Sequence, residues 1–71
     1  FMLRFRRERI RILREAVGES LYTFGKRFGV PPQSVQMWEV GKNQPRLKIL
    51  MRICDGMNVP IQYFFTTKKK R

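Results

Sequence analysis

Apolar residues recur at helical spacing in short segments of the chain, and glycine or proline separates these segments. Leu21, Phe24 and Phe28 lie at i, i+3 and i+7, which places them on one face of a helix. Gly29 follows directly, as glycine does just past a helix end. Ser20 precedes the segment, and its hydroxyl can accept a hydrogen bond from a free N–H of the first turn. The pattern therefore predicts a helix from Leu21 to Phe28.

A second short helix is predicted from Pro32 to Val40. Proline suits the first helical position because its missing N–H would be unpaired there, and Gly41 ends the segment. Val35 and Trp38, three residues apart, predict the inward face. Two short helices joined by a tight glycine-containing turn form a helix-turn-helix, whose second helix can lie in the major groove of DNA.

The outward face of this second helix suits contact with base edges. Glutamine can form two hydrogen bonds with adenine, serine can bond several base edges, and an apolar side chain can contact the thymine methyl group. The only acid of the segment is Glu39. A solvated surface helix could carry the same residues, so this pattern alone leaves both interpretations open. The candidate base-contacting residues are Gln33, Ser34, Gln36 and Met37.

Residues 3–17 are expected to form one helix with two apolar sides. One stripe comprises Leu3, Ile10, Leu13 and Val17, and the other comprises Phe5, Ile12 and Ala16. A helix with two apolar sides is covered from two directions. One cover is the domain's own core, and the other would be a second subunit or a segment outside this sequence. The alternative is a frayed, partly exposed first turn.

The same segment has the highest density of positive charge. Its arginines are interrupted by Glu8 alone, and they are Arg4, Arg6, Arg7, Arg9 and Arg11. We interpret them as phosphate contacts, with a solvated face as the alternative. We therefore assign residues 1–9 to an arginine-rich extension of the first helix, residues 10–65 to the helix-turn-helix domain and residues 66–71 to a flexible basic tail.

Two more helices are predicted towards the C-terminus. The longer spans residues 46–58, with Ile53 beside its apolar stripe and Asn58 as a left-handed C-cap. The stripe comprises Leu47, Leu50, Met51, Cys54 and Met57. Pro60 then starts a short fifth helix with Ile61, Phe64 and Phe65, which would supply a dimer contact or only cap the core.

Composition narrows the classes of function. The chain has 71 residues, which fits one small domain, and such domains bury only about 60% of their unfolded surface, so a dimer would help. A net charge of +11 predicts an anionic partner, nucleic acid first and an anionic membrane surface second. With no His and a single cysteine, Cys54, the chain is expected to be no enzyme and to hold no metal or cofactor.

A set of residues spread along most of the chain matches the pattern of a known family. They are Leu13-Arg14, Gly18, Ser20, Gly25, Gly29-Val30, Val35, Trp38-Glu39, Gly41-Lys42 and Pro45, followed by Leu47, Leu50, Ile53 and Val59. This set resembles the Cro/C1-type (XRE-like) helix-turn-helix domain of phage repressors and bacterial transcription regulators, over about residues 10–65. The resemblance implies an all-α fold, a compact bundle of five helices.

The resemblance also implies roles for single residues. It pairs Arg14 with Glu39 in an inward ion pair, which would explain an acid on a helix that faces phosphates. It assigns base contacts to the start of the second short helix, including Pro32. Phosphate contacts would come from Lys42, Asn43 and Arg46, and the outward Lys26 and Arg27 would lie where helix 21–28 crosses the DNA backbone.

Three positions depart from the family pattern. Leu21 replaces a phosphate-binding glutamine, Val40 replaces a polar or basic residue, and Pro31 replaces a hydroxyl N-cap. Each change removes a backbone anchor or a cap. The additional N-terminal arginines and the basic tail would offset the lost contacts, and the alternative is that ordinary operator binding has been lost.

We therefore expect a cytoplasmic transcription regulator, a repressor, of bacterial, archaeal or phage origin. It would bind double-stranded DNA sequence-specifically as a homodimer, with two copies of helix 32–40 about 34–36 Å apart on a two-fold symmetric site. The dimer contact would be the Phe5/Ile12 face or the Ile61–Phe65 region. The alternatives are an antitoxin-like or other protein-interaction module, and a non-specific binder of nucleic acid or anionic surfaces. No membrane span is expected, because no apolar run approaches about 20 residues.

Overall fold

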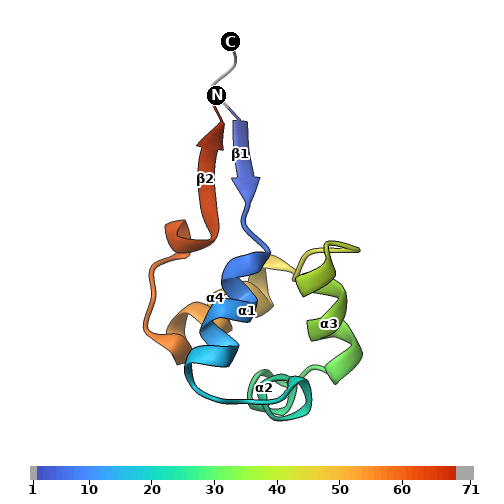
Figure 1. The fold of residues 1–71 in the computed structure, drawn as a ribbon. Coiled ribbons are helices and arrows are strands. Elements are labelled where there is room, and N and C mark those ends of the chain that lie inside the picture. The colour runs from blue at the N-terminus through green and yellow to red at the C-terminus, as the bar shows by residue number, and fades with distance from the viewer. Residues whose placement is uncertain (1, 69–71) are drawn as a thin grey trace.

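Glycines and capping residues divide the chain into short elements in this computed structural model, which describes residues 2–68. The elements are β1 (Met2–Phe5), α1 (Glu8–Ala16), α2 (Leu21–Phe28), α3 (Pro32–Val40), α4 (Leu47–Met57), the 3₁₀ helix η1 (Ile61–Phe64) and β2 (Phe65–Lys68). The helices form the body of the molecule, and β1 and β2 project from it as a two-stranded ribbon (Figure 1).

The two predicted helices around the central turn are confirmed with their boundaries. The Ser20 hydroxyl accepts a hydrogen bond from the Thr23 N–H at 3.1 Å and so caps α2, and Gly29 ends α2 in the left-handed conformation. Gly25 allows the turn to approach α2, because a Cβ at this position would lie 2.5 Å from the Val30 carbonyl oxygen. The close neighbour of Gly25 is thus the turn backbone.

The core joins every helix of the body. Its buried side chains are Ile10, Phe24, Phe28, Val35, Trp38, Leu50, Ile53, Cys54 and Phe64. The inward positions of Val35 and Trp38 are confirmed. The predicted stripe of α4 is wrong at Leu47 and Met51, which are exposed, because α4 buries the face that carries Leu50, Ile53 and Cys54.

The predicted helix over residues 3–17 is wrong at its start. Residues 2–5 form a strand that pairs antiparallel with β2, with Phe5 opposite Phe65, and α1 begins only at Glu8. The Phe5 ring packs on Phe64 at 6.2 Å and on Phe65 at 5.7 Å between ring centroids. Cross-strand pairing and these aromatic contacts, which local helical spacing cannot reveal, therefore decide the conformation.

The same ribbon corrects the other terminal assignments. Residues 1–9 do not form one extension of the first helix, because residues 2–5 form β1 and only Glu8 and Arg9 lie in α1. Residues 66–68 belong to β2 and are not a flexible tail. Residues 69–71 of that predicted tail lie outside the described residues. The predicted fifth helix is the single 3₁₀ turn η1, so the all-α body has four α-helices plus this turn. Within residues 2–68, no helix combines the length and apolarity that crossing a membrane requires.

The proposed dimer surfaces also change. Phe5 is half-buried and packs against Phe64 and Phe65, so Ile12 is the exposed member of that pair. In the Ile61–Phe65 region Phe64 is fully buried and Ile61 is the exposed apolar residue.

Candidate nucleic-acid interface

The outer face of α3 presents a continuous exposed stripe. Gln33, Gln36, Met37 and Val40 lie at i, i+3, i+4 and i+7 and are exposed, while Val35 and Trp38 point into the core. Ser34, the remaining candidate for base contact, is half-buried at the flank of the stripe. It lines a shallow hollow of about 260 Å³ together with Asn43 and Arg46.

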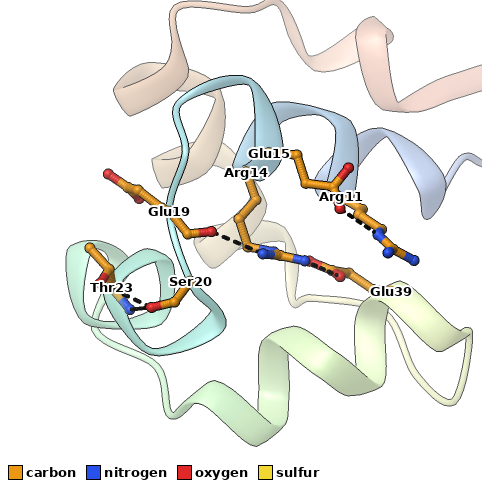
Figure 2. A network of polar contacts seen from close by, with 7 residues as sticks. All are labelled: Arg11, Arg14, Glu15, Glu19, Ser20, Thr23 and Glu39. Atoms are coloured by element: carbon orange, nitrogen blue, oxygen red, sulfur yellow. Dashed lines mark hydrogen bonds and ion pairs between the residues drawn. The ribbon is translucent and has the colours of Figure 1, made fainter.

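An inward ion pair fixes α3 from behind. Arg14 Nε donates to Glu39 Oε2 at 2.7 Å and Nη2 donates to Oε1 at 3.0 Å, and both side chains are largely buried. Arg14 Nη1 also donates to the Glu19 carbonyl oxygen at 2.9 Å, which links α3 to the start of α2 through α1 (Figure 2). The hydrogen bond to Glu39 raises the pKa of Arg14. The structure thus contains the pair that the resemblance implies, and the one acid of α3 is turned away from the exposed stripe.

The C-terminal end of α3 is held by an arginine that precedes α1. Arg7 Nη1 donates to the Val40 carbonyl oxygen at 2.5 Å. Gly41 has a φ of 85°, a left-handed conformation that favours glycine. A Cβ at this position would displace the Arg7 guanidinium, the end of a flexible side chain, from its place beside the Val40 carbonyl. Asn43 Nδ2 lies 3.7 Å from Met37 Sδ, which joins the loop after α3 to the exposed stripe.

The candidate phosphate-binding residues fall into two separate places. Lys42, Asn43 and Arg46 are exposed in the loop between α3 and α4, beside the stripe. Lys26 and Arg27 are exposed at the end of α2, where they border a hollow of about 600 Å³ shared with α4. Arg27 is also paired with Glu19. The structure therefore brings together only the first three of these residues around α3.

The prediction that all five N-terminal arginines lie on one helix is correct for Arg9 and Arg11, and it missed the position of Arg4 and Arg7 beside the loop after α3. Arg4 and Arg7 line a cleft of about 410 Å³ with Lys42, Asn43 and Gln44. The available signal was weak: Leu3, Arg4 and Phe5 alternate apolar and polar side chains, and Phe65 to Thr67 are aromatic and β-branched, both of which are typical of strands.

The side chains around α3 can bind base edges and anions. Amide, hydroxyl and thioether groups lie on the helix, and guanidinium and ammonium groups surround its C-terminal end. Within residues 2–68 no group of three or more His, Cys, Asp and Glu could hold a metal ion. Cys54 is buried in the core, and its burial raises the pKa of the thiol.

Comparison with known proteins identifies the same helix-turn-helix unit. The helix-turn-helix family model matches residues 10–64. Two curated relatives, named "Uncharacterized HTH-type transcriptional regulator", come from Sinorhizobium medicae (strain WSM419) and Rhizobium meliloti (strain 1021), and each is 35% identical over 57 residues. That stretch is 80% of this chain and 41% of each relative, so the chain spans about two fifths of their length.

A solved structure shows the same fold. It is the P22 c2 repressor protein in complex with synthetic operator 9T, which superposes with a TM-score of 0.78 at 23% identity over 86% of this chain and 92% of that one. This likeness shows the fold of the chain and not its function. Since the family model covers most of its length, the chain belongs to the Cro/C1-type helix-turn-helix family.

Proposed function

We propose that this chain is the DNA-binding unit of a transcription regulator and that α3 enters the major groove. The observation that carries the proposal is the exposed, uncharged stripe of α3, whose nearby acid Glu39 is held inward by Arg14. The net charge of +11 suits a polyanion. The names of the relatives and the operator in the P22 c2 complex support the same assignment.

In this proposal the two kinds of residue divide their tasks. Gln33, Gln36 and Met37 contact base edges and give specificity, and Ser34 contributes at the flank. Lys42, Asn43 and Arg46 contact phosphates and set the position of α3 along the groove. Lys26 and Arg27 would contact only DNA that reaches the end of α2.

The regulator would act as a repressor in the cytoplasm, by occupying its site as a homodimer. Two copies of α3 would then contact successive major grooves, about 34–36 Å apart, on a two-fold symmetric sequence. The exposed apolar residues Ile12 and Ile61 remain as the candidate contacts between subunits. No catalytic step is assigned to the chain.

Selection from random duplex DNA tests the proposal. We expect a preferred, two-fold symmetric sequence that binds roughly a thousandfold more tightly than a scrambled duplex at physiological salt. Equal binding to every duplex, with a steep dependence on salt, would instead favour a non-specific nucleic-acid binder. Binding to a protein partner with no measurable binding to DNA would favour an antitoxin-like interaction module.

Two substitutions separate base contact from phosphate contact. Gln33→Ala should relax the preference at one base pair, with a loss of about 1–3 kcal/mol in discrimination, because a bidentate contact is removed. Lys42→Ala should weaken binding to all sequences alike and lower the slope of log K against log salt by about 1. An unchanged preferred sequence in Gln33→Ala would refute the base-contact assignment.

A further inference from the structure

The cleft between β1 and the loop after α3 collects positive charge from two distant parts of the chain. Arg4 and Arg7 come from β1 and from the residue just before α1, and Lys42 comes from the loop after α3. The amide side chains of Asn43 and Gln44 complete the polar lining of this space of about 410 Å³. We name it the ribbon cleft.

The charge in the ribbon cleft is not neutralised by its own acid. Glu8 is the acid that borders the cleft, and Arg6 donates to it at 2.6 Å, so that carboxylate is already paired. Among the residues that the structure describes, Arg4 and Lys42 form no ion pair, and both are exposed. Three cations thus face an open space of a size that admits a phosphate group.

We propose that the ribbon cleft binds one phosphate of the DNA backbone, next to the bases that α3 contacts. This inference rests on the proposed function and adds Arg4 and Arg7 to the DNA-binding surface. A guanidinium offers a planar set of N–H donors that matches phosphate oxygens. Arg7 uses Nη1 on the Val40 carbonyl oxygen and keeps its other N–H groups for a ligand.

The same contacts connect the bound phosphate with the exposed stripe of α3. Arg7 donates to the carbonyl oxygen of Val40, the last residue of α3. Asn43 Nδ2 lies 3.7 Å from the sulfur of Met37. A phosphate in the cleft is therefore fixed relative to the C-terminal end of the stripe. Since phosphate contacts set the register of a protein on the duplex, the cleft positions α3 along the groove.

The second basic hollow, at the end of α2, lacks these properties. Lys26, Arg27 and Arg52 border it, but Arg27 is engaged by Glu19, and the acid Asp55 lies in its lining. It also shares no lining residue with the ribbon cleft among the described residues. Arg52 consequently provides a matched control, an exposed arginine of equal charge away from α3.

A scan of neutral phosphates tests the proposal directly. Single methylphosphonate substitutions are placed along the selected duplex, and binding is measured for the unaltered chain and for Arg4→Ala. We expect one position per half-site where neutralisation weakens binding by the unaltered chain on the order of tenfold. Arg4→Ala and Lys42→Ala should each show a smaller loss at that position, because each variant has already lost one of the contacts to this phosphate and keeps the others. Arg52→Ala should show the same loss as the unaltered chain.

The dependence on salt provides a second arm, which needs no preferred sequence. Arg4→Ala should lower the slope of log K against log salt by about 1, and Arg52→Ala should leave that slope unchanged. Circular dichroism verifies that each variant is folded. Arg7→Lys keeps the charge but loses the planar donor set, and it should weaken binding at the same phosphate.

The outcomes distinguish this inference from the proposed function. Suppose that a preferred sequence is found and that Arg4→Ala responds to every methylphosphonate like the unaltered chain. This result would refute phosphate binding in the ribbon cleft and leave the proposed DNA-binding function standing. The absence of any preferred sequence refutes the proposed function. In that case an unchanged salt slope in Arg4→Ala also overturns the cleft, and a slope reduced by about 1 retains it as a phosphate site.

Discussion

The two faces of α3 differ in how firmly the rest of the molecule holds them. On the inner face, Val35 and Trp38 are part of the buried core and Glu39 receives two hydrogen bonds from Arg14. On the outer face, Gln33 and Gln36 are exposed to solvent. Under the proposed function, the inner side of this nine-residue helix serves stability and the outer side serves recognition. Substitutions on one side should therefore leave the property of the other side unchanged.

The largest effect should follow from removing the central aromatic residue of the inner face. Trp38→Ala should lower the free energy of unfolding by about 3–5 kcal/mol, because a buried ring is lost and a cavity is left. For a domain of this size that is a large part of the total stability. Urea unfolding followed by circular dichroism measures it. Gln33→Ala, the outer-face control, should change the free energy of unfolding by no more than about 0.5 kcal/mol.

The ion pair behind α3 should have the next largest effect. Arg14→Ala should destabilise the chain by about 3 kcal/mol, because it leaves the Glu39 carboxylate buried without its partner. Arg14→Ala combined with Glu39→Gln should be less destabilising than the sum of the two single changes, since the second change removes the unpaired charge. Urea unfolding of the three variants provides this double-mutant cycle. Strict additivity would show that the pair does not hold α3.

The smallest effect, and one confined to recognition, is expected on the outer face. Gln36→Ala should reduce discrimination at one base pair by about 1–3 kcal/mol and leave the unfolding midpoint in urea unchanged. Competition binding with duplexes that vary single base pairs measures the first quantity. If Gln36→Ala lowered stability as much as affinity, the division between the two faces would be lost.

Local signals in the sequence were sufficient for the elements around the turn. Ser20, Gly29, Pro32 and Gly41 mark helix ends through chemistry that acts within a few residues, so α2 and α3 were predicted with their boundaries. Periodicity also predicted the exposed stripe of α3. Helix ends and the faces of a helix depend on residues a few positions apart, so they can be predicted from the sequence alone.

The ribbon could not be predicted in the same way. The spacing of Leu3, Ile10 and Leu13 fits a helix. Phe5 nevertheless lies in a strand, where it packs on the rings of Phe64 and Phe65 from the opposite end of the sequence. The ribbon cleft has the same origin, because Arg4 and Lys42 meet only after folding. The pairing of β1 with β2 therefore outweighed the helical spacing at the start of the chain. It also determined which arginines belong to the candidate site.

The antiparallel ribbon also determines how the molecule responds to mechanical force. Met2 faces Lys68 at the outer end of the ladder and Phe5 faces Phe65 at the inner end (Figure 1). Tension applied through both strands from the outer end loads the cross-strand bonds one pair at a time, because these bonds lie perpendicular to the strands. The ladder opens towards Phe5 before the helices carry any load. Pulling on the chain would therefore withdraw Arg4 from beside α3 while the core is still intact.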